Sequence, residues 1–330
     1  MLASIGSSVE SFLNAAGDFF SSLGEVGWGP LFLGLMSFLV YLTLRARGFF
    51  HTLRAAYPGE RIAFRRIWGA YIAAYGFNNV VPARGGDVIK LFLVKSSVPN
   101  STYPAVGAAF FVEAVFDAVM GVFILTFAFT QGAFPKPPDF SKIPAFDLQF
   151  FASHPRFLLF VLTALGVGVL VGFAMLSHRV RAFWARVRQG LTILRDRRRY
   201  MREVFVWQLA GWCFRFLAFW MLLDAFNVGG SVRNALLVLG VNAVAAVVPF
   251  TPGGAGVQQA LLVKVFSGSA PAATVAAYSV GQQIAIGAWT LFVGFLALFF
   301  IFRIRSFKEA IQLGREHRES ERQQQAPRPA

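Results

Sequence analysis

The chain has 330 residues, of which 56% are hydrophobic and only 14% are charged. Soluble globular domains carry about 25% charged residues, so this composition excludes an ordinary soluble domain and indicates a chain that folds in a lipid bilayer. The formal net charge is +15, but the Lys and Arg residues concentrate in three stretches that border apolar segments. Such stretches are typical of topology signals, and we therefore expect no nucleic acid partner.

The residues that usually carry cofactors and metals are few and scattered. The only cysteine, Cys213, excludes an intramolecular disulfide. No Walker A sequence, dinucleotide fingerprint or nucleophile elbow occurs. The histidines lie in separate connecting or tail segments without metal-ligand spacing: His51, His154, His178 and His317. We expect no cofactor, no metal site and no ATP-driven step within this chain.

The chain begins with a segment, residues 1–28, whose first 27 residues contain no Lys or Arg. It lacks the basic region of a secretory signal peptide, so we expect it to be retained. Its apolar residues recur at helical spacing, which predicts an amphipathic helix. Two interpretations are open for that helix: it lies at the membrane surface or packs on the rest of the protein.

Long apolar runs follow, and most approach the ~20 residues that cross the hydrocarbon layer as a helix. They lie at residues 29–44, 105–130, 157–176, 204–226, 236–249 and 272–302. These runs predict an all-α polytopic membrane domain over residues 29–303. We interpret residues 304–330 as a polar cytoplasmic tail without fixed structure.

The basic residues are distributed very unevenly among the connections. Six Arg lie in residues 45–66, nine in 179–202 and seven Lys or Arg from 303 onward. The other predicted loops together contain four: Lys136, Lys142, Arg156 and Arg233. The positive-inside rule places the three basic segments in the cytoplasm. The amino terminus and the Pro-rich loop 132–155 then lie outside, which predicts a multi-pass protein of the cytoplasmic membrane.

This orientation requires two re-entrant hairpins. Residues 67–95 leave the cytoplasmic side, are interrupted at 81–87 and must return to it, whereas residues 236–266 start outside, are interrupted at 249–256 and return outside. Both interruptions contain Val-Val-Pro followed by Gly-Gly. We predict an inverted repeat with halves at about 29–131 and 204–303, joined by a linking helix at 157–176 and an Arg-rich cytoplasmic loop at 178–203.

The two interruptions are the predicted binding site. Irregular backbone at membrane depth must be enclosed in protein or line a polar cavity, glycine permits close approach of a ligand, and a helix that starts after the break favours an anion at its amino end. The predicted substrate-binding residues are Arg84, Gly85, Gly86, Asp87, Lys90, Glu113, Asp117, Thr251, Gly253, Gly254, Gln258 and Gln259. The predicted supporting residues are Asn78, Asn79, Pro82, Arg215, Asn242, Pro249, Pro252 and Gln282.

Several roles stay open for these residues. If the charged residues near the first break faced lipid, their insertion into the membrane would together cost more than ~10 kcal/mol. They therefore either bind substrate and protons or form an ion-pair cluster of Arg84 with Glu113 or Asp117. The Gln residues either bind ligand or join helices. We expect Asn78, Asn79 and Asn242 to satisfy backbone groups freed by the breaks. The Arg-rich loop either attracts anionic headgroups or only sets topology.

Three motifs occur in order: Asn-Asn-Val-Val-Pro-Ala-Arg-Gly-Gly-Asp at 78–87, Val-Glu-Ala-Val-Phe-Asp at 112–117, and Pro-Phe-Thr-Pro-Gly-Gly-Ala-Gly-Val at 249–257. Over about residues 29–302 the chain resembles the transmembrane region of lysylphosphatidylglycerol synthases and related flippase-like proteins. It departs from the family pattern at three positions: Asp87 and Gln259 stand where Glu is usual, and Ala114 replaces Arg. The loss of a carboxylate at Gln259 weakens any proton-coupled mechanism that relies on the second hairpin.

The resemblance implies that the protein moves a lipid between leaflets. We expect a phosphate-bearing phospholipid, glycolipid or polyprenyl-linked lipid, bound by Arg84 and the glycine-lined breaks. The chain lacks an aminoacyltransferase domain, so we expect no lipid lysylation by it alone. Two alternatives are a non-catalytic membrane partner of a lipid-modifying or glycosyltransferase enzyme and, more weakly supported, a membrane-embedded enzyme acting on a lipid phosphate. We expect no enzymatic activity.

Overall fold

The computed structural model describes residues 24–79, 85–132, 183–245 and 257–303. Within these ranges every regular element is a helix, which confirms the predicted all-α class. The amphipathic segment 1–28 falls almost entirely outside the described residues, as do the linking helix 157–176, the tail 304–330 and the second predicted break, 249–256. Of the first predicted break, 81–87, residues 81–84 are outside, whereas residues 85–87 are helical, so this interruption is shorter than predicted.

In the described part of the chain, four helices are long and apolar enough to cross a membrane. They are α2 (Trp28–Ala56), α5 (Tyr103–Thr130), the continuous helix Arg197–Ala225, and α12 (Ala272–Ile301). The third comprises α8 (Arg197–Tyr200), the π-helical turn η4 (Met201–Phe205) and α9 (Val206–Ala225). At ~1.5 Å per residue each reaches ~42–45 Å, the thickness of a bilayer with its headgroups. The chain is therefore a multi-pass membrane protein, as predicted.

One of these helices extends further than expected. The sequence predicts that the first span ends at Leu44, but α2 continues to Ala56. Its buried side keeps the helical spacing of Phe38 and Leu42 through Phe49 and Leu53, all of which are nearly inaccessible. The helix is longer than the apolar run 29–44 because its apolar side continues past the first arginine.

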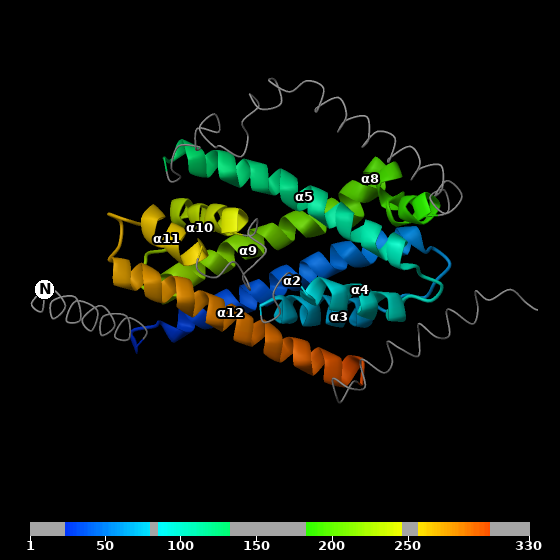
Figure 1. Cartoon of the computed structure of the whole chain (residues 1–330), viewed down its shortest axis with the longest axis horizontal. Helices are drawn as coiled ribbons and strands as arrows, with labels where there is room; N and C mark the ends of the chain where they lie inside the picture. Colours follow the sequence, from blue (N-terminus) through cyan, green and yellow to red (C-terminus); the bar gives the residue numbers. More distant parts are fainter. Residues whose placement is uncertain (1–23, 80–84, 133–182, 246–256, 304–330) are drawn as a thin grey trace, which may run out of the picture.

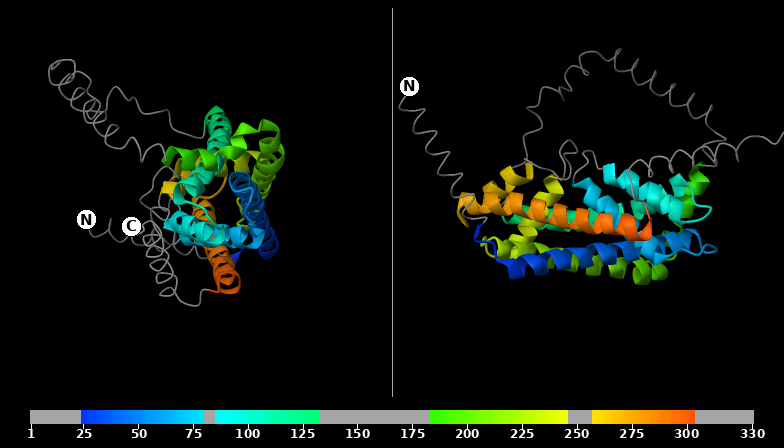
Figure 2. Two further views of the ribbon diagram at one scale, coloured as in Figure 1. Left: turned by 90° about the vertical axis from the view of Figure 1, so that its right-hand side faces the viewer. Right: turned by 90° about the horizontal axis from the view of Figure 1, so that it is seen from below.

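Four shorter helices form the two predicted hairpins. They are α3 (Phe64–Asn78) with α4 (Gly85–Ser97), and α10 (Val232–Ala245) with α11 (Val257–Val265). The longest has 15 residues, or ~22 Å, too short for the ~30 Å hydrocarbon layer. Figure 1 shows α3 and α4 near one end of the long axis and α10 and α11 near the other, and Figure 2 shows the same separation from below.

The helix neighbours occur in matching pairs. α2 packs along α9, α3 packs against α12 as α10 packs against α5, and α4 contacts α5 as α11 contacts α12. These are the neighbours expected if α2, α3, α4 and α5 correspond to α9, α10, α11 and α12. The inverted repeat itself stays a prediction, because neighbour pairs alone do not establish the symmetry.

Small residues allow the closest helix contacts. A Cβ atom added to Gly76 on α3 would lie 2.7 Å from the carbonyl oxygen of Thr290 on α12, and one added to Gly86 on α4 would overlap the carbonyl oxygen of Ala74 on α3. Close backbone approach through small residues is a usual means of helix association in membranes. These contacts hold the first hairpin against α12 and keep its two arms together.

Candidate functional site

The first feature of the interior is an ion pair between α2 and α5. Arg45 is 4% exposed, and its Nη1 and Nη2 atoms donate to Oδ1 and Oδ2 of Asp117 at 2.5 and 2.7 Å. Its Nε atom donates to the hydroxyl of Tyr71 on α3 at 3.1 Å. A two-point guanidinium–carboxylate contact is geometrically specific as well as strong. Arg45 thus joins three helices, two of them spans.

A second arginine lies beside this pair on α9. Trp212 Nε1 donates to Oδ1 of Asp117 at 3.1 Å, so Oδ1 accepts from both Arg45 and Trp212, and Oδ2 accepts from Arg45. The Arg215 guanidinium lies over the Trp212 ring, 4.7 Å from its centroid, and 5.7 Å from the Tyr41 ring centroid. Arg45 approaches the same Tyr41 ring at 5.9 Å. The two guanidinium groups therefore share one aromatic neighbour.

The second interior ion pair joins α4 to α5. Lys90 Nζ donates to Glu113 Oε2 at 2.8 Å, and both residues are buried. Three rings surround the ammonium group, with centroids 4.0 Å away for Tyr71, 4.3 Å for Phe110 and 4.5 Å for Phe49. Such faces attract a desolvated cation. The other carboxylate oxygen, Glu113 Oε1, is buried without a hydrogen-bond partner.

These contacts bear on the predicted cluster of Arg84 with Glu113 or Asp117. Arg84 and Pro82 lie outside the described residues, and both carboxylates have other partners, Lys90 and Arg45. Sequence reasoning missed Arg45, which it counted among the loop arginines. The available signal was its spacing: Arg45 follows Tyr41 by one helical turn, on the same side of α2 as the buried Phe38 and Phe49.

Polar contacts also close the first hairpin beside its break. Asn78 Nδ2, on α3, donates to Oδ1 of Asp87 in the first turn of α4 at 3.0 Å. Asn79 Nδ2 donates to the carbonyl oxygen of Tyr75 at 3.0 Å and to Thr290 Oγ1 on α12 at 3.4 Å. Asn79 therefore contacts a backbone group, and among the described residues Asn78 bonds a carboxylate. Gly85 is partly buried, and Gly86 is buried against α3.

The second hairpin uses neutral side chains in comparable places. Gln258 Nε2, on α11, donates to Asn242 Oδ1 on α10 at 2.8 Å. A backbone contact of Asn242 at the break stays a prediction, since the break lies outside the described residues. Gln259 Nε2 donates to Gln283 Oε1 on α12 at 2.8 Å. These glutamines join helices, and Gln282 is buried with neither amide atom hydrogen-bonded. The remaining predicted residues lie outside the described ones: Pro249, Thr251, Pro252, Gly253 and Gly254.

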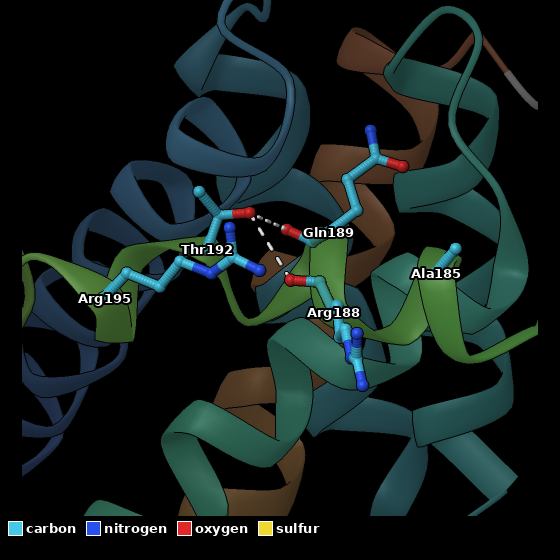
Figure 3. Close-up of a pocket in the computed structure, with 5 residues that line it drawn as sticks. All are labelled: Ala185, Arg188, Gln189, Thr192 and Arg195. Atoms are coloured by element: carbon cyan, nitrogen blue, oxygen red, sulfur yellow. Dashed lines mark hydrogen bonds between the residues drawn. The ribbon is translucent and has the colours of Figure 1, made fainter.

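A separate pocket lies on the Arg-rich segment. It has a volume of about 360 Å³ and is lined by Ala185, Arg188, Gln189, Thr192 and Arg195 (Figure 3). Thr192 Oγ1 donates to the carbonyl oxygen of Gln189 at 2.6 Å, and Gln189 Nε2 donates to that of Ala56 at the end of α2 at 3.1 Å. None of the lining residues belongs to the interior ion pairs.

Comparison with known proteins places the chain in one family. A family model described as the lysylphosphatidylglycerol synthase TM region matches residues 16–294. The matched region includes both hairpins and all the predicted site residues. No curated protein matches the chain.

Proposed function

Since the chain belongs to the lysylphosphatidylglycerol synthase transmembrane-region family, we propose that it moves a phosphate-bearing lipid between the leaflets of the cytoplasmic membrane. The lipid is a phospholipid, a glycolipid or a polyprenyl-linked lipid with an anionic headgroup. In this proposal the protein is a transporter and catalyses no covalent step.

The proposal rests mainly on two ion pairs inside the helix bundle, Arg45–Asp117 and Lys90–Glu113. A charge at the centre of a membrane helix costs about 2.5 to 3.5 kcal/mol on insertion scales. A buried ion pair is often no more stabilising than apolar residues of similar size. Charges at such places are therefore better explained by a polar substrate than by stability alone.

The proposed mechanism uses exchange of ionic partners. α4 and α11 both begin next to a break, and the amino end of a helix attracts an anion. Arg84 and these two helix ends bind the headgroup phosphate as it passes between the hairpins. Lys90 and Arg45 release Glu113 and Asp117 in part to contact the same phosphate, and the carboxylates recapture them when the lipid leaves.

Exchange between leaflets tests the proposal directly. The protein is reconstituted in vesicles of phosphatidylethanolamine and phosphatidylglycerol that carry a trace of fluorescent phosphatidylglycerol, and dithionite reports the dye that reaches the outer leaflet. We expect faster exchange than in protein-free vesicles. The double variant Lys90→Met with Glu113→Gln leaves no unpaired buried charge, and we expect it to slow exchange about tenfold or more, the effect of ~1.4 kcal/mol in the limiting step.

The matched control is Arg199→Met with Glu203→Gln. It removes an ion pair of the same kind, with Nε and Oε2 at 2.9 Å, whose side chains are 38% and 36% exposed. We expect wild-type exchange from it. Exchange no faster than in protein-free vesicles would end the transport proposal for this lipid class and favour the role of a non-catalytic membrane partner. Wild-type exchange by the Lys90 and Glu113 double variant would remove that pair from the mechanism.

A further inference from the structure

Among the described residues, Arg215 is a cation inside a membrane span with no anionic partner. It is partly buried on α9, close to the middle of the span Arg197–Ala225. Within the described ranges the interior ion pairs are Arg45–Asp117 and Lys90–Glu113, and Arg215 belongs to neither. Its contacts are two aromatic faces, those of Trp212 and Tyr41.

The nearest carboxylate that the contacts identify is already engaged. Asp117 accepts both Nη atoms of Arg45 and the Nε1 proton of Trp212. Arg45, Arg215 and Asp117 together therefore carry one excess positive charge. The only carboxylate on α9, Asp224, accepts a hydrogen bond from the backbone amide of Gly230 at 2.6 Å and lies more than two helical turns from Arg215.

The described residues do not supply the anion that an arginine at this depth calls for. Charged residues in spans are rare and generally pair or face water, and aromatic faces only partly replace a counter-ion. Guanidinium presents a planar set of donors that matches phosphate and does not lose its proton. Exposed apolar side chains lie near it on the same helix: Phe214 is 36% and Leu217 39% exposed, which suits acyl chains.

We propose that Arg215, held between Trp212 and Tyr41, binds the phosphate of a lipid headgroup that approaches from the bilayer at the junction of α5 and α9. The Trp212–Asp117 hydrogen bond joins these helices at that point. The inference rests on the proposed function, because it takes the lipid bound there to be the one transported. The bound phosphate lies next to Arg45, where it competes with Asp117 for the guanidinium.

The test measures lipid binding rather than transport. Purified protein in detergent is titrated with dioctanoyl phosphatidylglycerol and followed by native mass spectrometry. We expect Arg215→Gln to bind about tenfold or more weakly, since a charge-assisted contact is lost, and Arg215→Lys to bind with intermediate affinity. Arg198→Gln is the control, because it removes an exposed arginine outside α9, and we expect wild-type binding from it.

Two further ligands distinguish the sources of the phosphate. Dioctanoylglycerol has the same chains without phosphate, and we expect no binding that depends on Arg215. Excess inorganic phosphate tests whether the site binds the free anion. If it fails to displace dioctanoyl phosphatidylglycerol, the site is a lipid site. If it displaces the lipid completely, so that binding needs no acyl chains, the inference is overturned. Equal binding of dioctanoyl phosphatidylglycerol by wild type and Arg215→Gln also overturns it.

Cross-linking of the wild type tests the same site without requiring that any variant folds. Phosphatidylglycerol with a diazirine on one acyl chain is photolysed in the complex, and we expect adducts on residues 206–225 or 103–130. Adducts confined to other helices overturn the inference. The leaflet-exchange assay is independent of this one. If the wild type exchanges lipid and Arg215→Gln binds it as well as the wild type does, the Arg215 site is overturned and the proposed function stands. If lipid binding depends on Arg215 but the protein does not exchange lipid, the Arg215 site stands and the proposed function is overturned.

Discussion

The ammonium nitrogen of Lys90 lies 4.0 Å from the centroid of the Tyr71 ring. The hydroxyl oxygen of the same tyrosine accepts a hydrogen bond from Arg45 Nε at 3.1 Å. One side chain of α3 thus contacts the cations of both interior ion pairs. Because α3 is an arm of the first hairpin, a displacement of that hairpin changes the surroundings of both pairs together.

Substitution of Tyr71 separates these two contacts. We expect Tyr71→Phe to keep the ring under Lys90 and to lower the free energy of unfolding by about 1.5 to 3 kcal/mol through the lost bond to Arg45. Tyr71→Leu loses both contacts and should be less stable still. Thermal unfolding of the purified variants in one detergent measures the order. Equal stability of the two variants would show that the ring contact with Lys90 contributes nothing.

The Arg45–Asp117 pair predicts a strong difference between breaking it and removing it. Arg45→Ala leaves Asp117 without its main partner, and loss of one member of a buried pair costs about 3 to 5 kcal/mol. Arg45→Met with Asp117→Asn leaves no unpaired charge, so we expect most of that loss to be recovered. Arg199→Ala, at an exposed pair, should cost no more than about 1 kcal/mol. A double variant as unstable as Arg45→Ala would contradict this account.

The close contact of α3 with α12 depends on Gly76. A Cβ atom there would lie 2.7 Å from the carbonyl oxygen of Thr290 and 2.8 Å from the Cα atom of Leu291, both backbone atoms that cannot rotate away. We expect Gly76→Ala to reduce stability and to slow leaflet exchange. Gly107→Ala on α5 is the control, because no atom lies within 4 Å of its added Cβ. Thermal unfolding that ranks Gly107→Ala below Gly76→Ala would refute this helix contact.

The single natural cysteine makes the orientation easy to test. In a Cys213→Ser background, Ser269→Cys lies in the exposed α11–α12 connection and Gly59→Cys in the exposed α2–α3 connection. The basic-residue distribution predicts the first outside and the second in the cytoplasm. We expect a membrane-impermeant maleimide to label Ser269→Cys in intact cells and Gly59→Cys only after permeabilisation. The opposite pattern would reverse the proposed topology.

Much of the architecture depends on local sequence patterns and was therefore predictable. The spans 105–130, 204–226 and 272–302 correspond to long described helices, and both hairpins have short arms on either side of their breaks. Hydrophobic length and Pro-Gly interruptions are properties of neighbouring residues, and the bilayer requires backbone groups to be satisfied within each segment. Glu113 and Asp117 were likewise identified from the sequence, because a charge within an apolar span stands out.

The partners of those charges were decided only by the tertiary structure. The sequence by itself determined a polytopic helical membrane protein with charged and polar residues at two broken hairpins. It did not distinguish Arg45, which closes a buried ion pair with Asp117, from Arg47 two residues later, which lies over the Phe64 and Trp207 rings. Which side of α2 faces the interior depends on how α5 and α9 pack against it. That packing sums many weak contacts between distant segments, so no local pattern encodes it.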